Sequence, residues 1–264
     1  AGPGTLDCTL AEGVFAARPI DMALGSGKLK LGPRIVLTGR PVVLVIPGGP
    51  VIEGVELTDQ FCDGWLKFIA PILSQATRCS GRFSLDVDES HLLLFDPAAG
   101  DLTGRLHIER GEVLPGPLFD EINNLIGGII SGVGVAAPQD LLGLDHPLVQ
   151  IAQQRVEFEL HEGRIHHAPM EFYARGVVIR TRGSVGLDQS LDLVASISLS
   201  DDLLSRARLL GALKGQALEI PISGTLRRPR LDPRAAGRLA EQLGQNVLDK
   251  LLNGGLQKLF DRND

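Results

Sequence analysis

The chain has 264 residues, of which 44% are hydrophobic and only 4% aromatic, and its formal net charge is −6. This length and hydrophobicity allow a core of Leu, Val and Ile, which excludes a disordered protein. The acidic balance and a sequence pI of about 5.5 argue against a general nucleic-acid binder.

Residues 1–57 predict a meander of short strands. Turn sequences rich in Gly and Pro separate five apolar runs. The runs are 14–16, 20–24, 28–31, 35–38 and 42–46. The chain begins at Ala1 with no Met, signal peptide or spanning helix, so we expect an excised part of a longer protein.

Residues 58–75 predict a helix that plugs the apolar face of a sheet. Thr58 is the expected N-cap, and Pro71 is expected to kink or interrupt the helix. The apolar stripe of this helix is broad and contains Trp65, the only Trp of the chain, for which we expect burial.

Residues 81–233 predict the main sheet with helical insertions at 118–130 and 201–213, and an amphipathic helix is expected over 234–260. Strands are expected on both sides of a loop formed by Asp96, Pro97 and Gly100. The apolar run 125–137 is too short for a bilayer, which needs about 20 residues, so we expect it to be buried.

The clearest strands are expected near 156–161, 176–187, 190–199 and 217–226, with a tight turn at 186–190. Alternation with a period of two sends neighbouring side chains to opposite faces, so each strand has one apolar and one wetter face. The apolar positions expected to line one concave side are Val177, Ile179, Val185, Leu187, Leu191, Leu193, Ile197, Leu199, Ile220, Ile222 and Leu226.

These patterns predict a single domain of the mainly β (α+β) class over residues 1–264. We expect a long, antiparallel, strongly curved and one-sided sheet, shaped as a groove or half-barrel and capped by amphipathic helices. What covers the apolar face is then the functional question.

Motifs for catalysis and metal binding fail on spacing. The segment from His161 to His166 approaches the zinc motif HExxH, but the second His is one residue late and Gly163 marks a turn. Residues 25–28 approach a phosphate loop but lack the Ser or Thr that would hold magnesium. Asp86, Asp88 and Glu89 could bind calcium, although a solvated strand face is the expected reading.

No nucleophile, base and orienting group converge in the sequence, so we expect no enzyme, no cofactor and no metal. The three cysteines are Cys8, Cys62 and Cys79. Cys62 and Cys79 could meet as a disulfide in an oxidising compartment or remain buried thiols, and the sequence leaves both open.

Arginines gather at the last turn of the sheet. Arg227, Arg228 and Arg230 could contact anionic lipid head groups. The alternative is that they are ordinary solvated residues that discourage pairing at a strand end.

Three segments resemble the AsmA-like C-terminal regions of large envelope proteins from planctomycete-type bacteria: 57–85, 97–117 and 176–232. The segment LEIPISGTLRRPRLDP is similar to the closing strand of the broader AsmA/TamB superfamily. It departs in having a single residue, Ile222, between Pro221 and Ser223.

The resemblance implies a protein that faces the periplasm, is anchored to the inner membrane outside this segment, and holds lipid acyl chains in a hydrophobic groove for lipid transport or outer-membrane biogenesis. Envelope proteins would be further partners. The alternative is a structural or interaction domain whose apolar face is filled by its own helices and which docks to envelope partners. The amount of apolar surface on the helices separates these two hypotheses.

Overall fold

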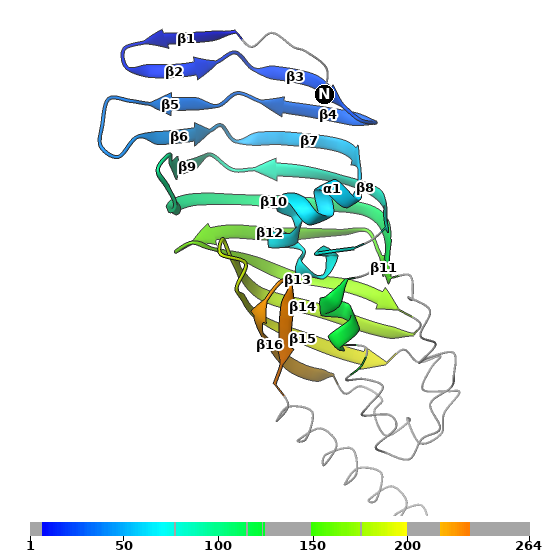
Figure 1. The fold of residues 1–264 in the computed structure, drawn as a ribbon. Helices are drawn as coiled ribbons and strands as arrows, with labels where there is room; N and C mark the ends of the chain where they lie inside the picture. The colour runs from blue at the N-terminus through cyan, green and yellow to red at the C-terminus, as the bar shows by residue number, and fades with distance from the viewer. Residues whose placement is uncertain are drawn as a thin grey trace, which may run out of the picture.

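The computed structural model describes residues 7–76, 78–114, 116–122, 124, 149–174, 176–199 and 217–232. Within these ranges the chain forms one 17-stranded sheet with antiparallel pairing and a few short helical segments (Figure 1). The expected mainly β, antiparallel fold is therefore confirmed.

The strands of the N-terminal part are β1 (Cys8–Ala11), β2 (Val14–Ala17), β3 (Ile20–Leu24), β4 (Gly27–Leu31), β5 (Arg34–Val36), β6 (Val43–Ile46), β7 (Gly49–Glu56), β8 (Arg78–Val87) and β9 (Ser90–Leu93). The remaining strands are β10 (Asp96–Leu114), β11 (Val149–Ile151), β12 (Gln154–His161), β13 (Arg164–Ala174), β14 (Val177–Gly186), β15 (Leu191–Leu199), β16 (Leu218–Thr225) and β17 (Arg228–Leu231). The helical segments are α1 (Asp59–Phe61), η1 (Cys62–Leu66), α2 (Lys67–Ile69) and η2 (Pro71–Leu73), and residues 117–122 are also helical.

Prolines divide the long strands of the N-terminal half into consecutive pieces. Pro19 separates β2 from β3, Pro33 separates β4 from β5, and Pro47 separates β6 from β7. Proline has no N–H to give to a ladder, so it ends each piece. The pairing continues on both sides of each break, because β5 lies between β2 and β6 while β4 lies between β3 and β7.

Two segments differ from the predictions. β7 was missed because Gly49 and Gly54 look like turn residues, and the structure gives them φ values of 140° and 58° within a strand whose register shifts against β8. The loop predicted at Asp96, Pro97 and Gly100 is wrong, because β10 begins at Asp96. Proline is tolerated there since this end of β10 pairs irregularly with β9.

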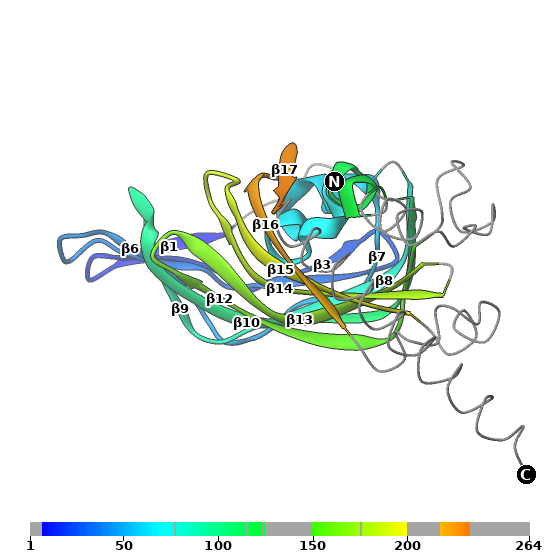
Figure 2. The ribbon, with the colours of Figure 1, turned by 90° about the horizontal axis from the view of Figure 1, so that it is seen from below.

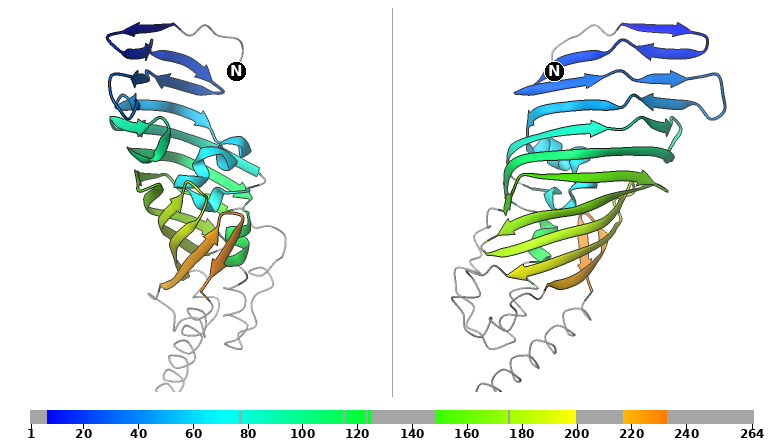
Figure 3. Two further views of the ribbon diagram at one scale, coloured as in Figure 1. Left: turned by 60° about the vertical axis from the view of Figure 1, so that its left-hand side comes forward. Right: turned by 180° about the vertical axis from the view of Figure 1, so that it is seen from behind.

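The sheet is curved, and the helical segments lie on its concave side, over the middle of the sheet (Figures 2 and 3). We call residues 59–73 the plug. This segment is buried, and the interruption expected at Pro71 is confirmed. The helix is distorted at Gly64, whose ψ is −117°, and it stops at Ala70 before Pro71. Thr58 precedes the first helical residue, but its side chain makes no capping hydrogen bond.

The plug is held in the core by aliphatic side chains. Leu66, Ile69, Ile72 and Leu73 are each at most 3% exposed. The expectation for Trp65 needs correction, because this side chain is only partly buried at the rim of the core. The helix is distorted at Gly64, directly before Trp65, so its apolar side chains do not all face the core. The Trp65 ring packs edge-on against Phe83 of β8 at a centroid distance of 5.8 Å.

The C-terminal end of the sheet closes against the plug. The side-chain amide of Gln75 donates a hydrogen bond to the carbonyl oxygen of Leu226, in the turn between β16 and β17, at 3.4 Å. α2 packs against β13 and β14. The last strands therefore wrap around the plug, which buries the apolar face that they carry.

Only part of one of the three remaining predicted helices lies among the described residues. Of the helix predicted over 118–130, the helical residues 117–122 are described, and Leu118 and Ile122 belong to the core. The helices predicted over 201–213 and 234–260 lie outside the described residues. Among the described residues, no helix combines the length and the apolar character that crossing a membrane requires.

Candidate functional site

Most of the residues predicted to line the concave side lie on one face of β14, β15 and β16, and Leu226 lies in the turn after β16. Cross-strand partners such as Ile179 with Ile197 and Leu193 with Ile222 place them side by side. Nine of the eleven are at most 8% exposed: Val177, Ile179, Val185, Leu191, Leu193, Ile197, Ile220, Ile222 and Leu226. They form the core beneath the plug, so this part of the face is filled by the protein itself.

The other two predicted lining residues lie elsewhere. Leu187 is 37% exposed and belongs to the turn after β14, so it is not a strand residue as expected. The tight turn explains this, since Gln189 has a φ of 70° and the strand ends at Gly186. Leu199 ends β15, and its side chain lies outside the described part of the chain.

The predicted head-group residues lie on the last hairpin. Arg227 is in its turn, and Arg228 and Arg230 lie on β17. All three are exposed, and no carboxylate among the described residues pairs with their side chains. Arg228 and Arg230 share the face of β17 opposite to Leu231, which packs against the core, so they point away from the plug.

An uncovered apolar face lies on strands that were not predicted to form the site. Leu10, Phe15 and Ile35 are successive cross-strand partners from β1 to β5, and Ile35 is followed by Leu44 and Leu92. We call these five residues the first ladder. Leu92 packs against the core, which places the first ladder on the same face as the plug.

A second ladder crosses the sheet beside the first. It comprises the successive cross-strand partners Met22, Leu29, Ile52, Leu85, Leu106 and Val156. Met22 is 40% exposed at one end of the row, whereas Ile52, Leu85, Leu106 and Val156 are each at most 9% exposed. The second ladder is therefore one continuous apolar row that is open at β3 and covered at β10.

The open end is apolar and accessible in this structure. Leu10 is 66% exposed, Phe15 is 37% exposed and Leu37, two residues beyond Ile35, is 47% exposed. None of the described helical segments lies over β1 to β6, whereas the plug lies over the strands that follow (Figures 1 and 3). Large contiguous apolar surface of this kind marks a binding site more often than a solvated surface.

Two polar atoms interrupt the covered part of the face. His167 Nδ1 lies 2.9 Å from the carbonyl oxygen of Ala168, so Nδ1 carries the proton and Nε2 is an acceptor. Nε2 of His167 and the hydroxyl of Thr181 have no hydrogen-bond partner among the described residues. Burial lowers the pKa of His167, because the charged imidazolium would lose its hydration in the core.

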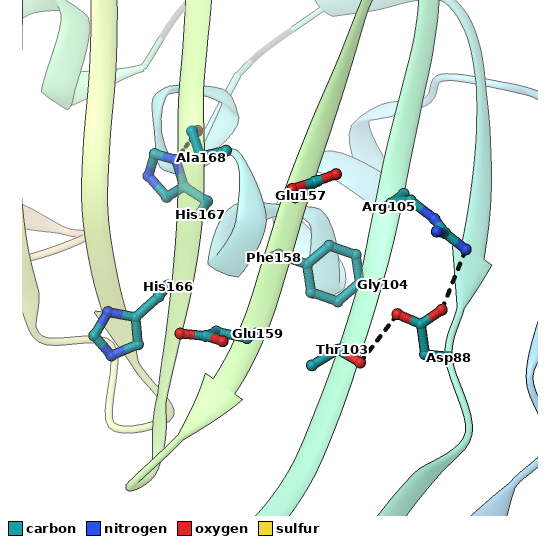
Figure 4. A pocket seen from close by; sticks show the side chains of 10 residues that line it. All are labelled: Asp88, Thr103, Gly104, Arg105, Glu157, Phe158, Glu159, His166, His167 and Ala168. Carbon is teal, nitrogen blue, oxygen red and sulfur yellow. Dashed lines mark hydrogen bonds and ion pairs between the residues drawn. The ribbon is translucent and has the colours of Figure 1, made fainter.

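The opposite face of the sheet holds a polar depression of about 480 Å³ that crosses β10, β12 and β13 beside Asp88, which follows β8 (Figure 4). Asp88 accepts hydrogen bonds from Thr103 and Arg105, both at 3.2 Å, and Glu157, Glu159 and His166 also line it. In Figure 4 the helical segments lie behind the strands that carry these side chains. The depression is therefore separate from the apolar ladders.

Cross-strand ion pairs make this outer face polar. Lys30 pairs with Glu53 at 2.9 Å, and hydrogen bonding to that carboxylate raises the pKa of Lys30. The hydroxyl of Tyr173 and then the guanidinium of Arg180 hold the pKa of Glu171 below its usual value. These groups neutralise one another across neighbouring strands, as in an ordinary solvated sheet.

The weak metal motifs do not come together. His161 ends β12 and His166 lies on β13, beyond the turn at Glu162 and Gly163. Asp86 lies 2.9 Å from His107, while Asp88 is engaged with Thr103 and Arg105. Across the described ranges, no three His, Cys, Asp or Glu side chains are grouped so that they could hold a metal ion.

Comparison with family models, curated proteins and solved structures gave no match for this chain. The resemblance to AsmA-like regions therefore remains a prediction, and the following argument starts from the geometry of the two ladders.

Proposed function

We propose that this chain is a non-enzymatic part of a bacterial envelope protein that faces the periplasm and binds lipid acyl chains along a hydrophobic β-groove, in lipid transport or outer-membrane biogenesis. The observation that carries the proposal is the second ladder, which runs without a polar residue from the exposed Met22 to the buried Leu106. In this proposal the plug closes one end of the groove, and β1 to β6 form its open part.

The dimensions of the ladders suit an acyl chain. Strands in a sheet lie about 4.8 Å apart, so the four steps of the first ladder span about 19 Å. One leaflet of a bilayer has a hydrocarbon thickness of about 15 Å, half of the roughly 30 Å of the whole core. A lipid tail laid across the strands from Leu10 to Leu92 would therefore touch apolar side chains along its length.

The energetics favour exchange over tight storage. Each methylene removed from water contributes about 0.8 kcal/mol, so ten buried methylenes contribute about 8 kcal/mol. This gain falls within the roughly 4–15 kcal/mol that association costs. A tail that arrives from a bilayer gives up a similar burial there, so its transfer to the ladders is close to balanced. Exchange with a bilayer is therefore reversible, whereas release into water exposes the tail and loses about 8 kcal/mol of burial, so we expect lipid to stay on the protein during purification.

The exposed arginines of the last hairpin are proposed to contact the anionic head groups of a membrane surface. Arg227, Arg228 and Arg230 carry three positive charges without carboxylate partners among the described residues. Each basic residue near an anionic lipid surface contributes about 1 kcal/mol. Arg228 and Arg230 point away from the plug, so they would meet the head groups of a membrane surface and not the head group of a lipid held on the ladders.

A structural or interaction domain is the second candidate. The burial of nine predicted lining residues beneath the plug favours it, because that part of the face has no room for a ligand. The apolar ladders of β1 to β6 would then be covered by an envelope partner protein. The two candidates differ in what occupies the same open face.

Lipid analysis of the purified chain separates the candidates. The protein is expressed in a diderm bacterium, extracted under native conditions and examined for co-purified lipid by mass spectrometry. We expect phospholipid with the parent protein, and a loss of at least tenfold with Met22→Glu or Phe15→Glu, because a carboxylate on the open face excludes an acyl chain.

The matched control is Ala23→Glu. Ala23 is exposed and follows Met22 on β3, so its side chain lies on the opposite face of the same strand. We expect this variant to keep its lipid. Equal lipid content in Met22→Glu and Ala23→Glu, or no lipid with the parent protein, would reject the groove and favour the interaction domain.

A further inference from the structure

Two cysteines meet where the plug touches the sheet. The Sγ atoms of Cys62 in η1 and Cys79 in β8 lie 2.7 Å apart. This separation is only about 0.7 Å longer than the roughly 2.05 Å of a disulfide bond. Cys62 is buried and Cys79 is half-buried, whereas Cys8, on β1 at the edge of the sheet, is exposed.

Two side-chain carboxylates hold the segments that carry the cysteines in place. The Asp59 carboxylate, three residues before Cys62, accepts a hydrogen bond from the backbone N–H of Cys79 at 2.9 Å. Asp63, the residue after Cys62, accepts one from the backbone N–H of Gln75 at 2.7 Å. The segment between the two cysteines is therefore already folded back, so bond formation needs only a small movement of side chains.

We propose that Cys62 and Cys79 form a disulfide that fastens the plug to β8 when the protein is in an oxidising compartment. The reaction needs an oxidant, and a thiol oxidoreductase or a small molecule that carries a disulfide supplies it. The bond closes the chain from residue 62 to residue 79 and keeps the plug on the concave face. The inference does not depend on lipid binding.

The two thiols have different roles in the exchange. Cys79 is more accessible, so its thiolate attacks the disulfide of the oxidant, forms a mixed disulfide and releases one thiolate. Hydrogen bonding to Cys79 and burial raise the pKa of Cys62, which keeps that thiol protonated until this stage. Cys62 then loses its proton to water, and its sulfur attacks Cys79 and releases the second thiol of the oxidant. Two protein thiols are oxidised, and one disulfide of the oxidant is reduced.

Thiol counting on the intact chain tests the proposal. The purified Cys8→Ser variant is treated with oxidised glutathione, freed of reagent, unfolded and alkylated, and its mass is measured. We expect no alkylated cysteine and the loss of two hydrogens, and two alkylated cysteines after prior reduction. Proteolysis of the oxidised sample should release one cross-linked peptide pair that contains Cys62 and Cys79. Two free thiols after oxidation, or glutathione retained on Cys79, would overturn the proposal.

Thermal unfolding gives a second readout, which compares oxidised and reduced protein of the same sequence. The oxidised Cys8→Ser protein should melt roughly 6–12 °C above the reduced one, since the disulfide closes a loop of moderate length. Cys79→Ser, which changes the more accessible partner, should abolish the difference between oxidised and reduced samples. Equal melting temperatures of oxidised and reduced Cys8→Ser protein would show that the bond does not fasten the plug.

Discussion

Phe83 of β8 is the side chain on which the plug rests, and its removal should destabilise the fold strongly. Phe83 is 0% exposed, and its ring meets Phe61 at a centroid distance of 5.3 Å and Trp65 at 5.8 Å, both in edge-on geometry. Truncating a buried Phe to Ala costs about 3–5 kcal/mol. Each aromatic pair adds roughly 0.5–1.5 kcal/mol beyond its buried area, so Phe83→Ala should fall near the upper end of that range.

Urea unfolding followed by circular dichroism measures this cost as a change in the free energy of unfolding. Phe95→Ala is the matched control, because Phe95 is 85% exposed and the same atoms are removed. We expect the control to change stability by less than about 0.5 kcal/mol. Similar costs for the two variants would refute the conclusion that the plug and β8 share one core.

Three further outcomes are expected. Burial lowers the pKa of His167 in the folded state. As the pH falls below about 6.5, the unfolded chain therefore binds the proton first, and the free energy of unfolding should drop by up to about 1.4 kcal/mol per pH unit. His167→Leu should reduce this pH dependence of the free energy of unfolding between pH 7 and pH 5. An unchanged dependence in His167→Leu, or a reduced one in the control His166→Gln, would count against this role of His167. Asp63→Ala should cost about 1 kcal/mol in urea unfolding by removing the acceptor for the backbone N–H of Gln75, and a neutral result would contradict that role. Gly183→Ala should lower the melting temperature measurably, because φ is 131° there and a Cβ would lie 2.3 Å from a backbone oxygen; full stability would disprove the strain.

Period-two alternation was sufficient to predict β12, β14, β15 and β16, but not β11 or β17. β14 and β15 lie within one residue of the segments predicted at 176–187 and 190–199, because each has one buried and one solvated face. The plug was also recognisable from its broad apolar stripe. Its breaks were not fully predictable, since the distortion at Gly64 depends on how the segment packs against Phe83 and its neighbours.

The open face could not be assigned from the sequence. In β6 all four residues, Val43 to Ile46, are apolar, so alternation does not say which side faces the plug. The assignment needs the cross-strand register that joins Leu10 to Phe15 and Leu44 to Leu92. Nine of the eleven predicted lining residues are instead buried in the core beneath the plug. Sequence pattern identifies an apolar face, but only tertiary packing decides whether it is filled.

The most direct test of the proposed acyl-chain groove is site-specific photo-crosslinking in living diderm bacteria. A photoreactive residue is placed at Met22 on the open end of the second ladder, and at Ala23 on the opposite face of β3 as a control. We predict crosslinks to phospholipid from position 22 and none from position 23. Crosslinks from position 22 that reach only protein, within the chain or in a partner, would contradict lipid binding and identify the ladders as an interaction surface.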